Sequence, residues 1–236
     1  MNAFDDELHR DFPRLLMEIE ADTELRVVVL TGNGSAFSAG GSIDEFETFR
    51  VDQGARRKAM RQARRLVDEM LNLHVPVVAA VNGAAVGLGA TLMTLCDIVF
   101  MSEDAFLADP HVGVALVAGD GSAVTWPAYA SLLKVKQYLF TGDRIPAADA
   151  LSMGLANFVV PAAELMPHAV AFAQRIALQP PQAIQDTKAV LNQILRSNAV
   201  ATLGYGIAAE THSHDTIEYA AVPAEFTRRS KPKPDA

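Results

Sequence analysis

Two glycine-rich turns, each at the end of an apolar run, hold the residues of this sequence best suited to chemistry. The run RVVVLTG at 26–32 leads into FSAGG at 37–41, and the run VPVVAAVNG at 75–83 leads into VGLGAT at 86–91. Glycine lets a backbone turn sharply and approach another group closely. The two turns could therefore direct two free N–H groups at one oxygen. Such a pair is an oxyanion hole built from main chain, which indicates chemistry on an acyl group.

The elements that must position these turns alternate between strand and helix. Apolar, largely β-branched runs at 26–31, 76–82 and 98–101 predict strands buried on both faces. Helices are predicted around them at 5–21, 45–72 and 89–96. This alternation predicts a layered α/β core over residues 1–160.

The second half of the chain is predicted to be more helical. Pro146 suits the first turn of a helix that Gly154 would stop, and 157–160 resembles a short strand. The other helices are predicted at 122–140, 163–178 and 181–197, with an alanine-rich continuation at 199–220. Residues 161–236 are therefore expected to form a helical C-terminal region attached to the core.

Composition excludes several classes of protein. The formal net charge of -8 over 236 residues argues against a general nucleic-acid binder. No uninterrupted apolar run of about 20 residues occurs, so a cytoplasmic protein with no membrane partner is expected. Cys96 is the single cysteine, which excludes an intramolecular disulfide and is typical of a small core residue.

Four segments together resemble the crotonase family, also called the enoyl-CoA hydratase/isomerase family. They are 26–46, 76–98, 105–121 and 138–161, and the similarity runs through nearly the whole chain. The resemblance implies an α/β core of repeated ββα units with a helical C-terminal trimerisation region, hence a homotrimer or homohexamer. The first residues resemble the middle of the family's usual opening, so its N-terminal hairpin is expected to be absent.

The resemblance also implies a substrate and a site. An acyl-CoA thioester would lie between the two turns, with the backbone N–H groups of Gly41 and Leu88 as the oxyanion donors. No cofactor is implied beyond the coenzyme A of the substrate, and no metal. The residues expected to contact the substrate are Ala39, Gly40, Gly87, Gly89 and Thr91.

The acid/base groups depart from the pattern of the family's hydratases. The two positions where hydratases place glutamates hold Thr91 and, after Pro110, His111. Asp120 is the carboxylate that remains, and it could move a proton, although a turn or helix cap would also explain it. His111 could carry the proton instead, or lie at the edge of the pocket. Isomerisation or another enolate step is therefore favoured over hydration, and the alternative is a non-catalytic homologue that binds acyl-CoA or a protein.

Other patterns carry less weight. The basic stretch at 56–65 could attract the phosphates of CoA, but a solvated helix face is the preferred interpretation. The glycines of GNG at 32–34 lack the third glycine of a dinucleotide-binding turn. His212 and His214 would not share one helix face, which argues against a metal site. Trp126 and Tyr129 are expected in the core or at an interface, and Met60, Met70 and Met93 are expected in the core.

Overall fold

The computed structural model describes residues 1–42 and 45–222, and it contains two four-stranded sheets. The first sheet has the order β1-β3-β5-β8 and is parallel throughout. The second has the order β2-β4-β6-β7, and only its β6–β7 pair is antiparallel. The strands are β1 (Val28–Thr31), β2 (Ala36–Ser38), β3 (Val77–Val81), β4 (Ala84–Val86), β5 (Ile98–Ser102), β6 (Phe106–Ala108), β7 (Ile145–Pro146) and β8 (Phe158–Val160).

The two sheets arise from a repeated unit in which one strand of each sheet is followed by helix. Along the chain β1 precedes β2, β3 precedes β4, and β5 precedes β6, each pair leading into a helix or a helical turn. This repeat is the ββα arrangement that the resemblance implies, and the expected α/β fold is confirmed. The first sheet was predicted strand by strand. The strands of the second sheet were missed because they span only two or three residues, mostly inside segments that read as turns.

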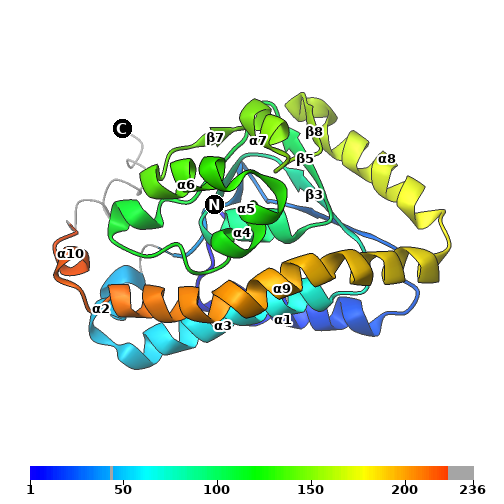
Figure 1. Cartoon of the computed structure of the whole chain (residues 1–236). Coiled ribbons are helices and arrows are strands. Elements are labelled where there is room, and N and C mark those ends of the chain that lie inside the picture. Colours follow the sequence, from blue (N-terminus) through cyan, green and yellow to red (C-terminus); the bar gives the residue numbers. More distant parts are fainter. Residues whose placement is uncertain (43–44, 223–236) are drawn as a thin grey trace.

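The seven α-helices that the structure describes up to residue 153 pack around the sheets (Figure 1). The charged stretch 45–72, predicted as one helical segment, forms two helices because Asp52 interrupts it. The Asp52 carboxylate accepts hydrogen bonds from the backbone N–H groups of Gly54 and Ala55, which caps the second helix. The helices are α1 (Asp6–Ala21), α2 (Phe46–Val51), α3 (Gln53–Asn72), α4 (Leu88–Leu95), α5 (Ser122–Tyr129), α6 (Leu132–Thr141) and α7 (Ala147–Met153).

The last helices cover the molecule on two sides. α8 (Leu165–Ala177) packs on one face of the first sheet, where Ala169 contacts a cluster that includes Val78 and Phe100 of β3 and β5. α9 (Pro181–Ser213) is one uninterrupted helix of 33 residues, and a short α10 (Ile217–Ala220) follows it. In Figure 1, α9 runs the length of the molecule beside α3, and the two helices are in contact. None of the helices in the described ranges is both long enough and apolar enough to cross a membrane.

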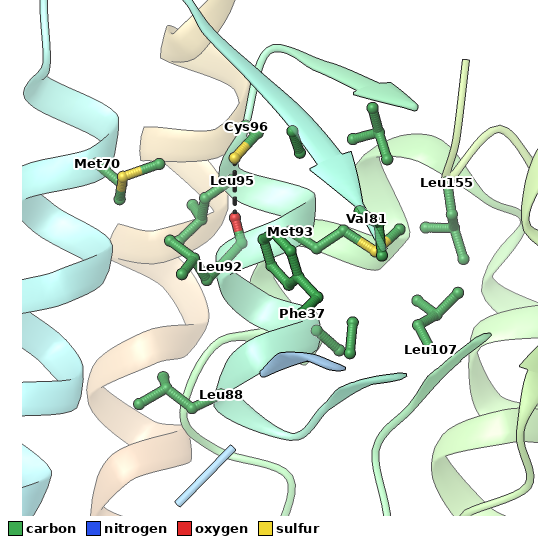
Figure 2. Close-up of a cluster of buried hydrophobic side chains, with 14 of the residues drawn as sticks. Phe37, Met70, Val81, Leu88, Leu92, Met93, Leu95, Cys96, Leu107 and Leu155 are labelled. Carbon is green, nitrogen blue, oxygen red and sulfur yellow. Dashed lines mark hydrogen bonds between the residues drawn. The ribbon is translucent and has the colours of Figure 1, made fainter. Parts of the chain in front are cut away.

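The core lies between the sheets, α4 and α3. Figure 2 shows Phe37 and Met93 at its centre, with the Cys96 thiol hydrogen-bonded to the carbonyl of Leu92 at 3.3 Å. Burial raises the pKa of the Cys96 thiol, which keeps it neutral and inert. Cys96, Trp126 and the three methionines are buried in the core as predicted, whereas Tyr129 is 41% exposed.

Two ionic contacts, each with a buried basic side chain, hold α9 and the residues just past it against the core. Near its start, the Lys188 ammonium lies 2.8 Å from a carboxylate oxygen of Asp97. Past its end, the guanidinium of Arg56 in α3 lies 2.8 Å from the carboxylate of Asp215. For Arg56 the prediction of a solvated face is wrong, because only 2% of the residue is exposed and it lies on the side of α3 that is buried. The other basic residues of this stretch are exposed as predicted: Arg57, Lys58, Arg61, Arg64 and Arg65.

Two glycines let α9 touch the loop that precedes α5. A Cβ built on Gly206 of α9 would lie 2.8 Å from the carbonyl oxygen of Gly119, and one built on Gly119 would lie 2.2 Å from that of Gly206. Neither position has room for a side chain. Gly204, one half-turn away on the same helix, has open space around it.

This contrast gives a matched pair of variants. Gly206→Ala should destabilise the fold by about 1–3 kcal/mol, because the new methyl group forces α9 away from the loop. Gly204→Ala should stabilise it by about 0.5–1 kcal/mol, since alanine favours helix and meets nothing. Urea unfolding followed by circular dichroism measures both. Equal effects of the two substitutions would show that the close approach does not constrain the fold.

Candidate active site

The two glycine turns, about 45 residues apart in the chain, meet in the structure because their backbones touch. β2 and β4, which precede the turns, pair in parallel. Gly40 has a φ of +78°, and a Cβ there would lie 2.4 Å from the carbonyl oxygen of Val86. A Cβ on Gly89 would lie 2.6 Å from the carbonyl oxygen of Ser38. Only glycine permits these approaches, which is why the turns carry it.

The amides of Gly41 and Leu88 are left without partners by this arrangement. Leu88 is the first residue of α4, where an N–H group has no acceptor within its own helix. Among the described residues, neither the Gly41 nor the Leu88 N–H donates to a backbone or side-chain acceptor. Both residues line one cavity of about 170 Å³. The structure therefore brings the two predicted donors to the same space.

The walls of this cavity are mainly apolar. Of the residues predicted to contact substrate, Ala39, Gly40 and Gly87 line the cavity, whereas Gly89 and Thr91 are not among its lining residues. The titratable side chains at its wall come from the loop after β6 and from the C-terminal end of α9, and Ser42 of the first turn adds a hydroxyl group. The lining consists of Ala39, Gly40, Gly41, Ser42, Phe46, Phe49, Met60, Ala63, Val86, Gly87, Leu88, Pro110, His111, Val114, Leu116, Asp120, Glu210 and His214.

His111 stands at the wall of the cavity and is held from behind by Asp109. The imidazole Nδ1 is hydrogen-bonded to the Asp109 carboxylate, whose side chain is fully buried. Burial by itself would lower the pKa of His111, but Asp109, Asp120 and Glu210 together raise it well above its usual value. The surrounding carboxyl groups therefore favour the protonated, cationic form of the imidazole. Burial by itself would raise the pKa of Asp109, yet the charge and hydrogen bond of His111 hold the pKa of that carboxyl below its usual value.

Asp120 lies on the other side of the same imidazole. Its Oδ2 is 3.7 Å from His111 Nε2, and its Oδ1 is 3.5 Å from the hydroxyl of Thr91, which is oriented to donate. Gly121 makes this contact possible: it has a φ of +145°, and a Cβ there would lie 2.2 Å from the Thr91 methyl group. Burial raises the pKa of Asp120 to about 6, while His111 opposes that rise. Thr91 thus orients Asp120 from outside the cavity.

Glu210 of α9 is a third carboxyl group at this site, and the sequence did not single it out. Its Oε1 lies 3.8 Å from His111 Nε2, and only 3% of the residue is exposed. Burial raises the pKa of Glu210 to about 8. The charge of His111 opposes this rise, and the charge of Asp120 adds to it. A signal for it did exist, because Leu203, Ile207 and Glu210 fall on one helix face that is otherwise apolar.

The cluster separates the pKa values of its carboxyl groups. The charge and hydrogen bond of His111 hold the pKa of Asp109 below its usual value, whereas burial raises the pKa of Asp120 to about 6 and that of Glu210 to about 8. Two carboxyl groups with pKa values pushed apart are suited to act as base and acid. Ligand atoms of Asp109, His111 and Asp120 lie within 4.8 Å of one another, a spacing that could suit a metal ion. The protonated imidazole, with Nδ1 already bonded to Asp109, makes a poor ligand.

These features define a two-sheet α/β protein in which one imidazole and three carboxyl groups lie beside two unpartnered amides. The sequence matches the enoyl-CoA hydratase/isomerase family over residues 1–233. This chain therefore belongs to the enoyl-CoA hydratase/isomerase family and is an enzyme of that family. The family resemblance stated from the sequence is confirmed.

Similar proteins differ in the reaction that their names give. A short-chain-enoyl-CoA hydratase of Clostridium acetobutylicum is 32% identical over 87% of this chain and 78% of its own length. A peroxisomal Δ(3,5)-Δ(2,4)-dienoyl-CoA isomerase of Arabidopsis thaliana is 30% identical over 85% of this chain and 75% of its own. The crystal structure of an enoyl-CoA hydratase/isomerase from Mycobacterium paratuberculosis superposes with a TM-score of 0.89 at 43% identity, covering 93% of this chain and 88% of that one.

The charge on His111 can be tested by removing the group behind it. Asp109→Asn should reduce the proton affinity of the imidazole about 10- to 1000-fold, because burial then acts with less opposition. Nuclear magnetic resonance of 15N-labelled histidine rings measures the titration directly. Asp104→Asn removes an exposed carboxylate from the preceding loop and should leave the titration of His111 unchanged. An unaltered His111 titration in Asp109→Asn would contradict the assignment.

Proposed function

We propose that this enzyme moves a proton on an acyl-CoA thioester through an enolate, and that it isomerises a double bond. Asp120 is the base that takes the first proton. The N–H groups of Gly41 and Leu88 form the oxyanion hole that receives the negative charge on the thioester oxygen. The observation that carries the proposal is the convergence of these two unpartnered amides and a buried, ionisable Asp120 on one cavity.

The position of His111 favours isomerisation over addition of water. Hydration with two carboxylates needs a water molecule held between them. Here the imidazole Nε2 lies 3.7 Å from Asp120 Oδ2 and 3.8 Å from Glu210 Oε1, so the ring takes up the space near both groups. Isomerisation needs no such water, because a proton is removed from one carbon and returned to another.

The proposed oxyanion hole also lies where the dipole of α4 would stabilise negative charge. The Leu88 amide is at the N-terminus of this helix, where the helix dipole places partial positive charge. An enolate oxygen in this place would accept two hydrogen bonds from main chain. A donor fixed in the backbone costs no reorganisation when charge develops, and loss of one costs about 3–4 kcal/mol.

The reaction can be determined with a panel of 2-enoyl-CoA and 3-enoyl-CoA esters in heavy water, with products followed by mass spectrometry. We expect migration of the double bond with deuterium uptake and no gain of water. Gain of water would identify a hydratase instead. Binding of CoA esters without any turnover would support the non-catalytic alternative.

Asp120→Asn tests the base. Turnover should fall about 100- to 10,000-fold while CoA-ester binding is retained, since the amide keeps the shape but cannot take a proton. In the wild type, activity should rise as pH rises through about 6, where Asp120 loses its proton. Steady-state rates across pH and isothermal titration with a CoA ester measure both effects. Near-full activity of the variant would exclude Asp120 as the base.

Leu88→Pro tests the oxyanion hole. Proline removes the N–H group, and the first position of a helix is the position where proline is best accommodated. We expect kcat to fall about 100- to 1000-fold. Leu88→Ala loses the same packing but keeps the donor, so it separates the two effects. Equal kcat values for the two variants would show that this amide does not bind the oxyanion.

A further inference from the structure

Glu210 has no task in the proton removal described so far, yet its burial is costly. It lines the cavity, 3% of it is exposed, and its Oε2 has no hydrogen-bond partner in the described part of the chain. A buried polar atom without a partner costs about 1–3 kcal/mol. A carboxyl group kept at that cost beside a reaction cavity calls for a function.

The fold holds Glu210 in this place through the close contact of α9 with the loop before α5. Gly206 lies one helical turn before Glu210, and its backbone touches that of Gly119. A Cβ on Gly119 would lie 3.0 Å from Glu210 Oε2, so glycine there also makes room for the carboxyl group itself. Gly119 directly precedes Asp120 in the chain. The same contact therefore sets the distance between the two carboxyl groups.

The charged groups around Glu210 come from three elements. The loop after β6 provides Asp109, His111 and Asp120, and the end of α9 provides His214. Arg56 of α3 is engaged with Asp215. Burial, with Asp120 and Asp109, outweighs the effect of His111 and keeps the Glu210 carboxyl protonated at neutral pH. Glu210 therefore has a proton to give when Asp120 is ready to take one.

We propose that Glu210 is a second catalytic residue, the acid that gives a proton to the far end of the enolate, and that His111 returns the proton from Asp120 to Glu210 after each turnover. This assignment rests on the proposed function. Its geometric basis is that His111 Nε2 lies within 4 Å of a carboxyl oxygen of each partner, at 3.7 Å from Asp120 and 3.8 Å from Glu210.

The steps balance for a 3-enoyl thioester. Asp120 takes a proton from C2, and the electron pair of that C–H bond forms a C1=C2 double bond while the carbonyl π pair moves to the oxygen. The oxygen then re-forms the carbonyl, the C1=C2 pair shifts to C2=C3, and the C3=C4 pair takes the proton of Glu210 at C4. The product is the conjugated 2-enoyl thioester, and no electrons are gained or lost overall.

The resting state is restored by proton transfer among the three side chains, whose protons exchange with solvent between turnovers. After the reaction Asp120 is protonated and Glu210 is ionised. The imidazolium gives its Nε2 proton to Glu210 and takes the proton of Asp120 in exchange. Asp109 keeps the ring in place through Nδ1, so that Nε2 stays directed at the two carboxyl groups.

The test separates removal of the first proton from delivery of the second. With 3-enoyl-CoA in heavy water, Glu210→Gln should lower isomerisation about 100- to 10,000-fold, because the amide cannot supply the proton. Deuterium uptake at C2 should persist, since Asp120 still exchanges that proton. Asp120→Asn should lose both activities. Glu218→Gln, which alters an exposed glutamate of α10, should behave like the wild type.

A second measurement needs no variant. Isomerisation by the wild type should fall as pH rises through about 8, where Glu210 loses its proton. Wild-type isomerisation that stays constant well above that pH, or a Glu210→Gln enzyme with the wild-type rate, would overturn the assignment of Glu210 while the proposed function stands. A wild type that neither isomerises nor takes up deuterium would overturn both.

Discussion

A positive charge buried on one imidazole ring is the interaction on which the site depends. An isolated buried ion costs several kcal/mol, and Asp109 offsets that cost for His111 by a direct hydrogen bond to Nδ1. The cation in turn favours ionisation of Asp120. One cation cannot offset three anions, and burial together with the neighbouring carboxylates keeps Glu210 protonated. The pKa values of the two cavity carboxyls are thus both raised by burial, and the charge of the ring opposes that rise at each of them.

Close backbone contacts provide the framework for this charge arrangement. Gly40 and Gly89 let the two turns touch, and Gly119 and Gly206 let α9 touch the loop that carries Asp120. Each contact joins segments that are far apart in the sequence. The placement of the unpartnered Gly41 and Leu88 amides depends on the first pair, and the carboxyl cluster depends on the second. The site therefore depends on glycines that allow close backbone contact as much as on the polar side chains around the cavity.

The sequence predicted those parts of the structure that depend on local patterns. Apolar runs located β1, β3 and β5. The family resemblance implied Gly41 and Leu88 as oxyanion donors, and that role stays a prediction. Glu210 was not predicted as a site residue, because its place in the site depends on which face of a long helix meets a loop some 90 residues earlier in the chain. Arg56 was predicted to be exposed because it belongs to a run of basic residues, but it lies on the buried side of α3. The expected trimer or hexamer stays a prediction.

The unbroken course of α9 makes the active site sensitive to chain length. Lys188 fixes the helix near its start, and Glu210 acts roughly 33 Å further along at 1.5 Å per residue. Each residue turns a helix by about 100°, so a single insertion or deletion between these two positions would point the carboxyl group at another part of the molecule. Relatives could vary the side chains of this segment freely on its outer face. Its length, by contrast, is fixed by the register that the chemistry needs.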